Sequence, residues 1–290
     1  MSLRPLDSGP ELSEEEFRLL RDFIHENAGL NFEDSQRVTV RSRLAGRLLA
    51  LDLASFEDYY HYLRFSPHRA EEFLRLVDHL TNNETYFFRE APQLKVFSEQ
   101  VLKAIKDRKT RAGERALRVL SVGCSSGEEV LTLAMLASDS GQFFWGWDLR
   151  FVGLDIDQGV VERATRGVYH QNSFRSTSPL LLERHFTRDG NGWAVRDSLR
   201  RQVEFRLGNL LDPASYEGLV PVDVLFCRNV LIYFSDVTTA RAVRVFHSVL
   251  APGGYLFLGH AESLSRVTSA FTPIRFPGAM IYQKPESPTR

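Results

Sequence analysis

The sequence predicts an α/β protein, in which a Rossmann-like, doubly wound sheet follows a small all-α domain and carries a small antiparallel β insertion. Three observations support this fold class. Apolar residues recur at helical spacing from Leu12 to about Leu80. From residue 116 onward, apolar runs that end in polar residues alternate with amphipathic stretches. Between Gly167 and Val203 no long helical pattern fits, which favours short strands in an insertion.

Composition limits the class of protein. With 290 residues, 43% of them hydrophobic and 25% charged, the chain is long enough for two globular domains. Its 36 basic and 37 acidic side chains give a formal net charge of -1, so no overall field attracts nucleic acid or an anionic membrane. Cys124 and Cys227 are too few for a disulfide framework or a thiolate metal site, which fits a reducing compartment.

Long apolar runs are absent from the sequence. The opening MSLRPLDSGPELSEEE has no apolar stretch of the signal-peptide kind. No later stretch reaches the roughly 18 unbroken apolar residues of a membrane span. We therefore expect a cytoplasmic protein without direct membrane insertion.

The first helix is predicted to begin at Ser13. Ser13 followed by Glu16 fits a capping box, in which each side chain accepts a hydrogen bond from the other residue's backbone N–H. Apolar residues then recur at helical spacing before Gly29, at Phe17, Leu20 and Ile24.

Three more helices are predicted before residue 81. The run SQRVTVRSRLAGRLLALDL keeps its apolar residues on one side, at Val40, Leu44, Leu48 and Leu51. At about 100° per residue, Arg43 and Arg47 fall together on the opposite side. Ser55 and Ser66 are predicted to cap the last two helices, so residues 1–80 form an all-α domain.

Two unusual stretches connect this domain to the first strand. TNNETYFFRE, residues 81–90, joins small polar residues, an aromatic cluster and an Arg-Glu pair, and we assign residues 81–92 as a linker. Its aromatics can pack in a core, and Arg89 and Glu90 can form a surface pair. Residues 103–118 carry seven basic side chains, which we interpret as a solvated helix end and a linker.

Residues 93–290 are predicted to form the sheet domain, with the β insertion at about 170–203. The runs ALRVLSV, FVGLDID, VEFRLGN, VDVLFCRN and GYLFLGH each end in polar residues and are separated by helical stretches. This alternation predicts a parallel sheet. FTPIRFPG and AMIYQKP are separated by a short turn, so we expect an antiparallel hairpin at one edge.

The glycine-rich turn after the first strand is a candidate ligand site, because ligands of open parallel sheets bind beyond the carboxyl ends of the strands. Gly123 and Gly127 allow a close approach of the backbone. Glu128 follows at the N-terminus of the next helix. Its carboxylate would repel a diphosphate there, but it could accept a hydrogen bond from a cationic or hydroxyl-bearing ligand. The spacing is not G-x-G-x-x-G. A purely structural turn is the alternative.

Polar residues also end the next three strands. Asp155, before Asp157, stands where an acid commonly binds ribose hydroxyls, although an exposed strand-end acid has the same pattern. Together with the glycine turn, Asp155 favours an adenosine-type ligand. Asn209 could bind an adenine edge or only form a turn. Asn229 and Tyr233 follow the fourth strand and would project at the rim of the sheet.

Two nucleophile or base candidates are disfavoured. Cys227 has no His near it in sequence and is better explained as a small buried residue. His260 is better explained as a loop histidine.

Taken together, these motifs make the chain similar to the chemotaxis-receptor glutamate methyltransferases, the CheR family, which use S-adenosylmethionine. TNNETYFFRE resembles the family's TN-x-T-x-FFRE, and GCSSGEE resembles its C-S-T-G-E-E turn. GLDID, RATRGVY, FCRNVLIYF and LGHAESL follow in family order. The resemblance covers nearly the whole chain, and the set of motifs is far more specific than any one of them.

The resemblance implies a class I methyltransferase sheet, with residues 81–92 as a lid over the cofactor. The residues it places around the cofactor are Asn83, Thr85, Arg89, Glu128, Asp155, Asn209, Leu210, Arg228 and Asn229. It implies that Arg89 and Tyr233 flank the methyl group. The implied reaction gives glutamate methyl esters and S-adenosylhomocysteine. Glu84 and Tyr86 are larger than expected at the variable positions of the lid motif.

The resemblance also implies the partner, the cytoplasmic helical region of methyl-accepting chemotaxis receptors. Family members dock a basic face of the N-terminal domain there, and the matching candidates are Arg37, Arg41, Arg43 and Arg47. Solvated surface arginines are the alternative. TRDGNGW is shorter than the loop with which relatives hold a receptor pentapeptide, which argues against that tether. We expect a monomer without a metal ion.

The sequence leaves two alternative functions. A non-catalytic module that binds S-adenosylmethionine or S-adenosylhomocysteine is disfavoured by the presence of Arg89, Asn229 and Tyr233. A nucleic-acid methyltransferase is suggested by the Asn-Val-Leu-Ile-Tyr-Phe loop, which is similar to the Asn-Pro-Pro-Tyr loop of amino-methylating enzymes. The missing prolines and the balanced charge argue against nucleic acid as a partner.

Overall fold

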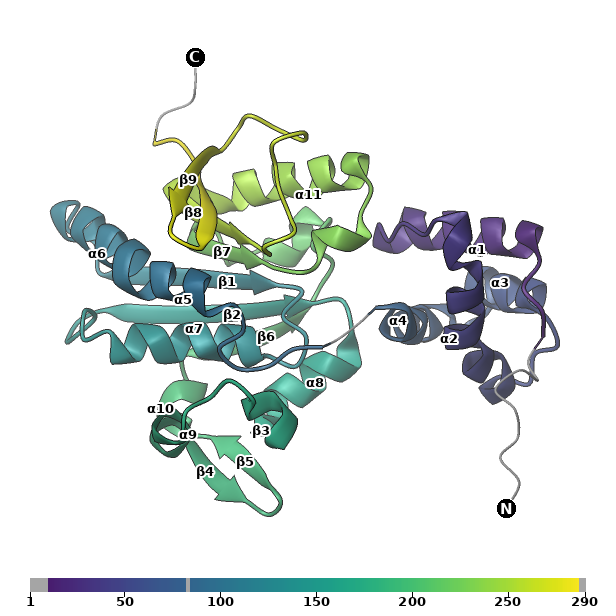
Figure 1. The fold of residues 1–290 in the computed structure, drawn as a ribbon, viewed down its shortest axis with the longest axis horizontal. Coiled ribbons are helices and arrows are strands. Elements are labelled where there is room, and N and C mark those ends of the chain that lie inside the picture. The colour runs from purple at the N-terminus through teal and green to yellow at the C-terminus, as the bar shows by residue number, and fades with distance from the viewer. Residues whose placement is uncertain (1–9, 82–83, 287–290) are drawn as a thin grey trace. The chain divides into compact units, whose positions relative to one another are not determined.

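The structure is a computed structural model that describes residues 10–81 and 84–286. The chain divides into two compact units, which are described separately. The helical unit comprises residues 1–83 together with Tyr233–Ser235, and the sheet unit comprises Glu84–Ile232 together with Asp236–Arg290. Figure 1 shows the elements of both units.

Four α-helices form the helical unit, as the apolar spacing predicted. They are α1 (Glu14–Ala28), α2 (Arg37–Ala50), α3 (Phe56–Phe65) and α4 (Arg69–Leu80). Their buried faces carry the predicted apolar residues, among them Leu20, Leu44 and Leu48. The predicted capping box of Ser13 and Glu16 is confirmed in both directions.

The two later caps differ from each other. Ser55 accepts a hydrogen bond from the backbone N–H of Asp58, so its predicted cap on α3 is confirmed. The predicted cap at Ser66 is wrong, because α4 begins at Arg69 with His68 in the N-cap position. The Ser66 hydroxyl instead accepts the N–H of His68, which forms a turn before the helix.

A buried ion pair joins α2 to α4 inside the helical unit. Arg47 Nε donates to Glu72 Oε1 at 2.9 Å, and the Tyr59 hydroxyl donates to the same oxygen at 2.8 Å. The side chains of Arg47 and Glu72 are 11% and 4% exposed. Arg47 therefore lies against α4 and not in solvent, since its long stem lets the guanidinium reach the neighbouring helix. The Glu72 carboxylate also raises the pKa of Arg47.

The chain returns to the helical unit after the fourth strand of the sheet. Leu30 and Phe234 form an isolated antiparallel bridge, and the N–H of Asn31 donates to the carbonyl of Tyr233 at 2.7 Å. Tyr233 is thus part of the helical unit, although it was predicted beside the reacting methyl group.

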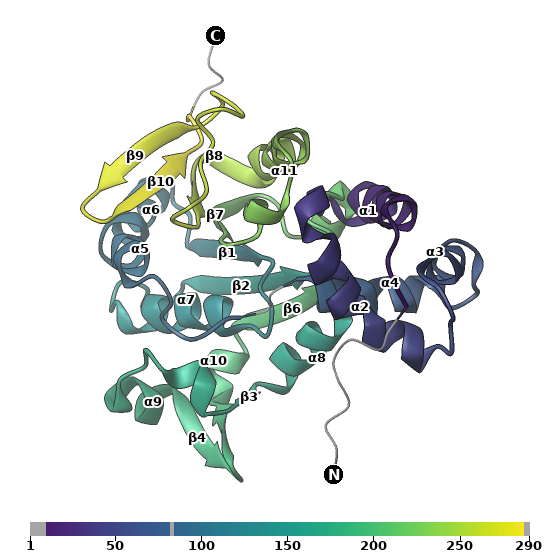
Figure 2. The ribbon, with the colours of Figure 1, turned by 45° about the vertical axis from the view of Figure 1, so that its right-hand side comes forward.

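A seven-stranded sheet forms the sheet unit, in the order β6-β2-β1-β7-β8-β10-β9 (Figures 1 and 2). The parallel strands are β1 (Ala116–Val122), β2 (Asp148–Asp155), β6 (Val203–Leu207), β7 (Val222–Cys227) and β8 (Leu250–Leu258). The strand order reverses between β1 and β7, which makes their carboxyl ends the expected ligand edge.

The predicted hairpin is confirmed at one edge of this sheet. β9 (Thr272–Phe276) and β10 (Ala279–Gln283) pair antiparallel, and β10 also pairs antiparallel with β8. Figure 2 shows this pair beside β8. Because β10 opposes the direction of its neighbours, the sheet is mostly and not wholly parallel.

The helices of the sheet unit surround its core. They are α5 (Ala91–Val96), which continues through a π-helical turn (Phe97–Val101) into α6 (Leu102–Arg111), then α7 (Glu128–Asp139), α8 (Gln158–Arg166) and α11 (Asp236–Val249). The largest apolar cluster packs α5, α6 and α7 against the sheet. Phe97, Phe226 and Phe257 meet ring to ring at its centre.

The predicted small antiparallel insertion is also present. It is a three-stranded sheet in the order β3-β5-β4, with β3 (Val168–Tyr169), β4 (Phe186–Asp189) and β5 (Gly192–Val195). Two short helices, α9 (Pro179–His185) and α10 (Asp197–Arg200), flank it. Within the described ranges, no helix is long and apolar enough to cross a membrane.

The substitution Arg47→Met should lower the free energy of unfolding by about 3–5 kcal/mol, because Glu72 keeps a buried charge without its cation. Urea denaturation followed by circular dichroism measures the loss. The double variant Arg47→Met/Glu72→Met should recover most of it. As a matched control, Arg75→Met removes only the exposed pair with Glu71 and should change stability by less than about 1 kcal/mol. Equal effects of the two single variants would contradict the buried pair.

Candidate functional site

The glycine turn after β1 is shaped by close contacts. Gly123 and Gly127 have φ of 69° and 92°, a region that favours glycine. A Cβ atom on Gly123 would lie 2.4 Å from Val230 Cγ2, and one on Gly127 would lie 2.7 Å from the ring of Phe205. The turn therefore needs both glycines for conformation and for space, and it brings the start of α7 to the carboxyl edge of the sheet.

Glu128 is a buried carboxylate at the N-terminus of α7. Its Oε2 accepts from the hydroxyl of Ser126 at 2.8 Å, and its Oε1 accepts from the hydroxyl of Ser173 at 2.9 Å. Burial raises the pKa of Glu128, and the two hydroxyls only partly oppose that effect. Arg163 opposes the effect of burial electrostatically, but no described cation forms an ion pair with Glu128. A buried carboxylate held by hydroxyls in this way suits a positively charged ligand group.

Asp155 ends β2 beside this turn. Its Oδ2 accepts the N–H of Ser125 at 2.7 Å, and its Oδ1 accepts the N–H of Asp157 at 3.0 Å. Asp157 has a different role, because its side chain caps α8 by accepting from Gly159 and Val160. Of the two acids that end this strand, Asp155 is thus the one bound to the glycine turn.

Asn209 and Leu210 follow β6 in a tight turn. The Oδ1 of Asn209 accepts the N–H of Leu211 at 2.9 Å, and the Asn209 N–H donates to the Ser215 hydroxyl at 3.0 Å. The carbonyl of Leu210 accepts from the Tyr216 hydroxyl at 2.8 Å. The turn-forming role weighed for Asn209 is therefore real, and a hydrogen bond from Gly208 to the Asp155 carbonyl, at 2.8 Å, brings the turn to the end of β2.

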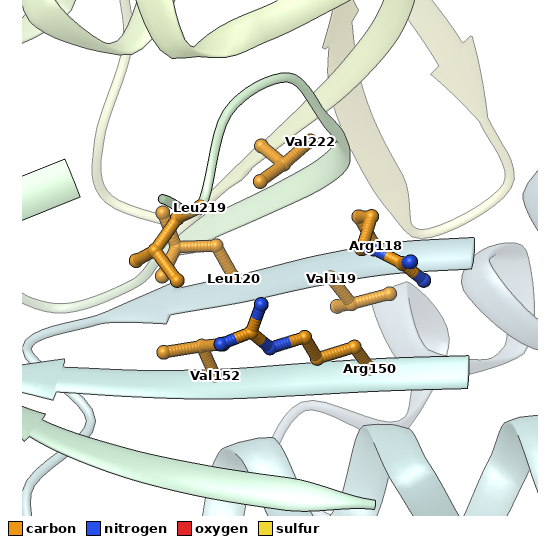
Figure 3. Close-up of a pocket in the computed structure, with 7 residues that line it drawn as sticks. All are labelled: Arg118, Val119, Leu120, Arg150, Val152, Leu219 and Val222. Carbon is orange, nitrogen blue, oxygen red and sulfur yellow. The ribbon is translucent and has the colours of Figure 1, made fainter. Parts of the chain in front are cut away.

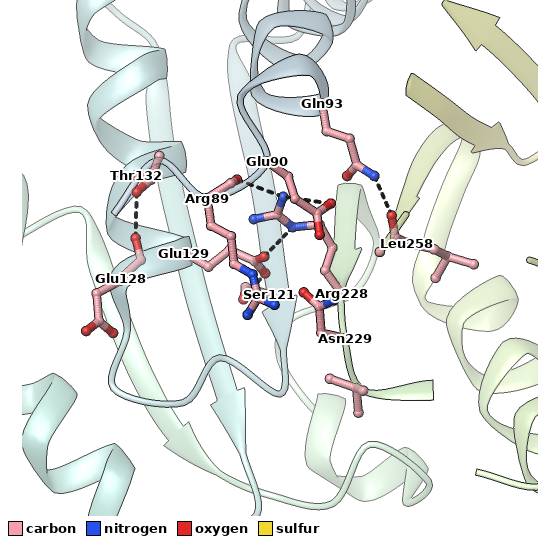
Figure 4. A network of polar contacts seen from close by, with 12 residues as sticks. Arg89, Glu90, Gln93, Ser121, Glu128, Glu129, Thr132, Arg228, Asn229 and Leu258 are labelled. Atoms are coloured by element: carbon pink, nitrogen blue, oxygen red, sulfur yellow. Dashed lines mark hydrogen bonds and ion pairs between the residues drawn. The ribbon is translucent and has the colours of Figure 1, made fainter. Parts of the chain in front are cut away.

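Arg228 is the centre of a buried polar network at the end of β7 (Figure 4). Its Nε donates to Glu129 Oε2 at 2.6 Å, and its Nη1 donates to the carbonyl of Arg89 at 3.0 Å. Glu90 Oε2 lies 3.5 Å from the same Nη1, and the Arg228 side chain is only 3% exposed. The Ser121 hydroxyl donates to the other oxygen of Glu129. Arg228 thus fixes the backbone that carries Arg89.

Glu262 holds the loop that carries Asn229. Its two carboxylate oxygens accept four backbone N–H groups, from Gly259 at 2.6 Å, Asn229 at 3.0 Å, Val230 at 2.9 Å and Ile232 at 3.2 Å. Asn229 itself has φ of 60°, an uncommon value for a residue other than glycine. Burial raises the pKa of Glu262 in spite of these donors. The carboxylate therefore determines the conformation of residues 229–232.

The aromatic residues of the 81–90 stretch divide their roles. Phe87 is fully buried, and its ring meets Tyr169, Phe174 and Phe186 of the insertion at 4.9–5.2 Å. The N–H of Phe88 donates to the Thr132 hydroxyl on α7 at 3.2 Å. The sequence allowed these aromatics either to pack in the core or to form a lid over the cofactor. Phe87 packs in the core.

Glu84 and Tyr86, the two large residues at the variable positions of the lid motif, share one partner, Arg175. Glu84 Oε1 accepts from Arg175 Nη2 at 2.6 Å, and the Arg175 guanidinium lies 3.7 Å from the centre of the Tyr86 ring. Arg89 donates to the Glu84 carbonyl at 2.8 Å. Thr85 is half-buried between them. Asn83, another predicted cofactor residue, lies outside the described residues.

The remaining nucleophile and base candidates have structural explanations. Cys124 and Cys227 are buried, and burial raises the pKa of both thiols well above its usual range. His260 is exposed and has a partner that sequence reasoning did not find, since its Nδ1 lies 3.3 Å from Glu90 Oε1. In the described part of the chain, no cluster of His, Cys, Asp and Glu side chains could hold a metal ion.

A small pocket lies away from this edge, on the face of the sheet opposite the large apolar cluster (Figure 3). Its apolar wall is Val119, Leu120, Val152, Leu219 and Val222. Two arginines complete it, and both are neutralised: Arg118 pairs with Asp148, and Arg150 pairs with Glu204 at 2.6 Å. The pocket therefore offers no charge for an ionic ligand and is not the candidate site.

The sequence did not predict the contacts of three carboxylates at this edge, Glu90, Glu129 and Glu262. Glu90 was considered as a surface partner of Arg89, but it lies beside the buried Arg228. Each of the three carboxylates lies inside a motif that had been recognised, namely FFRE, GCSSGEE and LGHAESL. A buried acid can only be expected where a buried cation or a row of N–H donors needs it. That need becomes visible only when Arg228 and the loop after β7 are placed in space.

Comparisons with known proteins identify the class. The family profile "CheR methyltransferase, SAM binding domain" matches residues 83–279, and "CheR methyltransferase, all-alpha domain" matches residues 15–81. The protein is an S-adenosylmethionine-dependent methyltransferase with a Rossmann-like sheet.

Curated relatives give the particular family. "Chemotaxis protein methyltransferase 2" of Vibrio cholerae is 37% identical over 275 residues, which are 94% of each chain. "Chemotaxis protein methyltransferase" of Escherichia coli is 35% identical over 90% of this chain and 88% of its own. "Probable biofilm formation methyltransferase WspC" of Pseudomonas aeruginosa is 33% identical over 92% of this chain and 60% of its own. The chain belongs to the CheR methyltransferase family.

The substitution Glu262→Gln should lower methyl-transfer turnover by about tenfold or more, equal to about 1.4 kcal/mol of barrier. A glutamine has one acceptor oxygen for four N–H donors and presents an amide NH₂ to the others. Steady-state kinetics with saturating cofactor measure the change. Glu217→Gln, at an exposed position, is the matched control and should leave turnover unchanged. Unchanged turnover in a folded Glu262→Gln variant would exclude the positioning role.

Proposed function

We propose that this enzyme transfers a methyl group from S-adenosylmethionine to glutamate side chains of chemotaxis receptors. Two relatives that cover most of this chain are named chemotaxis methyltransferases, which supports the receptor as substrate. The observation that carries the proposal is Glu128, a buried carboxylate at the carboxyl edge of the sheet that forms no ion pair with another described residue. A non-catalytic binding module is not favoured, because the matching profile is that of a methyltransferase.

The donor set at this edge fits the cofactor. Glu128 would accept from the cationic amino group, and Asp155 would accept from the ribose hydroxyls. Asn209 and Leu210 would border the adenine. The residues proposed to complete the site are Asn83, Thr85, Arg89, Arg228 and Asn229. The network of Arg228 supports a positioning role for that residue, since two of its nitrogens donate to Glu129 and to the backbone of Arg89.

The reaction itself needs no general base. S-adenosylmethionine supplies a methyl group on a positively charged sulfur. A glutamate ionises near pH 4.3, so the accepting carboxylate is already charged at neutral pH. The buried, protonated state of Cys124 and Cys227 agrees with such chemistry, which needs no thiolate. What the protein must contribute is alignment and the exclusion of water, and alignment alone can lower a barrier by about 7 kcal/mol.

Arg89 is the proposed orienting residue for the substrate carboxylate. Its backbone is fixed by Arg228, and one of its nitrogens donates to the Glu84 carbonyl. A guanidinium held in this way can orient a carboxylate without enclosing it, which matters because a tight ion pair would reduce the nucleophilicity of the substrate. We predict that Tyr233 is the second residue that orients the substrate carboxylate.

Labelled methyl transfer tests the proposed function. The enzyme is incubated with methyl-labelled S-adenosylmethionine and membranes that carry the receptors of its own organism. We expect label on receptor glutamates as esters that alkali hydrolyses. Arg89→Ala should lower turnover much more than cofactor affinity. Label that resists alkali, or that appears on other residues, would refute the glutamate substrate.

Cofactor affinity should depend on pH through Glu128. Because burial raises the pKa of this carboxyl, it takes up a proton at a higher pH than the ordinary value of about 4.3. Binding of a cationic amino group needs the ionised form, so affinity should fall as the pH is lowered through the raised pKa. Calorimetric titrations between neutral and mildly acidic pH measure this. The variant Glu128→Gln should bind the cofactor weakly, and its affinity should not change over this pH range. If the variant showed the same pH profile as the wild-type enzyme, Glu128 would not be the group that binds the amino group.

The helical unit is proposed to dock on the helical region of the receptor through α2. Arg43 is exposed, although its Nη1 donates to the carbonyl of Leu80 at the end of α4. On the same helix Val38 and Leu49 are 69% and 84% exposed. Gly46 has open space where a side chain would stand. Arg37 pairs with Glu14 and Arg41 pairs with Glu11, and both of these acids are exposed. Arg47 is held by Glu72 inside the unit. We further propose that the enzyme is a cytoplasmic monomer.

The substitution Arg43→Glu should raise the KM for receptor by about tenfold, because it reverses a charge at an acidic partner. Cofactor affinity should not change. Arg69→Glu, an exposed position on α4, serves as the control and should leave KM near its original value. Arg47 is unsuitable for this test, since its replacement disrupts the buried pair. If KM stays constant in a folded Arg43→Glu variant, docking does not use this face of α2.

A further inference from the structure

The loop between α7 and β2 exposes two large aromatic side chains. Trp145 is 96% exposed and Phe144 is 67% exposed, and we call these two residues the aromatic tip. Large apolar side chains in a soluble protein rarely stand adjacent in full contact with water. Neither residue belongs to the carboxyl edge of the sheet, because the loop enters β2 at Asp148 and so lies at the opposite, amino edge.

The loop is built so that these two side chains point outward. Phe143 and Trp147, on either side of the tip, pack edge to face with ring centres 4.9 Å apart. The N–H of Trp147 donates to the carbonyl of Phe144 at 3.3 Å, which closes the turn. Gly146 has φ of 83°, so the reversal uses a conformation that favours glycine. The exposure of the tip follows from this geometry.

Basic residues at the end of α6 adjoin the loop. The carbonyl of Arg115 accepts the N–H of Asp148 at 2.9 Å. The Arg115 guanidinium lies beside Gly146, since a Cβ atom there would be 3.1 Å from its Nη1. Arg111 is exposed one turn earlier, at the last residue of α6. These contacts bring the basic segment of residues 103–118 to the aromatic tip.

Part of this segment's charge is not neutralised within the protein. Arg108 and Lys109 lie close to the buried Asp223, at 3.4 and 2.9 Å. Among the described residues, in contrast, Lys106, Arg111 and Arg115 form no ion pair with an acid. We call these three residues the basic strip. Arg111 and Arg115 are exposed, Lys106 is half-buried, and Arg115 adjoins the tip through Gly146. The net charge of the whole chain, in contrast, is only -1.

From this arrangement we propose that the aromatic tip and the basic strip form a peripheral docking surface for an anionic lipid bilayer. Tryptophan and phenylalanine partition into the headgroup region, and lysine and arginine are attracted to anionic headgroups. A convex pair of aromatics fits a fluid interface. A groove with recessed stacking surfaces would instead favour single-stranded nucleic acid. The surface does not depend on which substrate the enzyme methylates.

Docking of this kind leaves the carboxyl edge accessible. The tip precedes β2, whereas Glu128, Asp155 and Arg228 lie at the other end of the parallel strands. The sheet unit would therefore bind lipid with one edge and present the opposite edge away from the membrane. Because only two aromatics and a few charges take part, binding is reversible and sensitive to salt.

Vesicle binding by the full-length protein tests the surface. Vesicles of phosphatidylglycerol and phosphatidylcholine in equal parts are compared with pure phosphatidylcholine by co-sedimentation. We expect at least about tenfold stronger binding to the anionic vesicles at low salt. Brominated lipids should quench the fluorescence of the wild-type protein more than that of Trp145→Phe. Equal binding to the two vesicle types, or no binding, overturns the proposal.

Two pairs of variants separate the components of the surface. Phe144→Ser/Trp145→Ser and Arg111→Glu/Arg115→Glu should each reduce binding to anionic vesicles by about tenfold. Phe65→Ser, which removes an aromatic that is 70% exposed on α3, and Arg266→Glu, at an exposed loop position, are the matched controls and should bind as the wild type. Unchanged binding in the first two variants overturns the proposal, as does a preference for single-stranded oligonucleotide over vesicles.

Discussion

One buried guanidinium links the segments that meet at the carboxyl edge of the sheet. Arg228 comes from the end of β7, Glu129 from α7, and Arg89 and Glu90 from the stretch before α5. A charge this deeply buried is stable only while its partners stay in place, and the loss of one partner of a buried pair costs about 3–5 kcal/mol. The three segments therefore move little relative to one another. The position of Arg89 depends on this constraint, because Arg228 binds its carbonyl.

The backbone at the same edge is held in uncommon conformations. Of the five non-glycine residues with positive φ in the described ranges, four lie here, namely Phe88, Glu90, Ser125 and Asn229. Such conformations cost of order 1–3 kcal/mol each and persist where the surroundings enforce them. The enforcing contacts are visible: Asp155 binds the N–H of Ser125, and Glu262 binds that of Asn229. The edge is thus arranged before a ligand arrives, which suits catalysis by alignment.

Local patterns made most of the fold predictable. The apolar spacing of Leu20, Leu44 and Leu48 and the alternation of strands and helices depend on neighbouring residues, and both were confirmed. The cap at Ser66 failed because a turn competed for the same hydroxyl. For the site, motif positions could be found from sequence, but the partners of Arg47, Arg228 and His260 could not. Those partners are 25 to 170 residues away along the chain, where no periodicity connects them.

The burial of both cysteines has a consequence for inhibitor chemistry. Cys124 and Cys227 adjoin the carboxyl edge, yet both thiols are buried, and burial raises the pKa of each well above its usual range. Peroxide and electrophilic inhibitors react with thiolates, so these two buried thiols should react slowly with such reagents in the native enzyme.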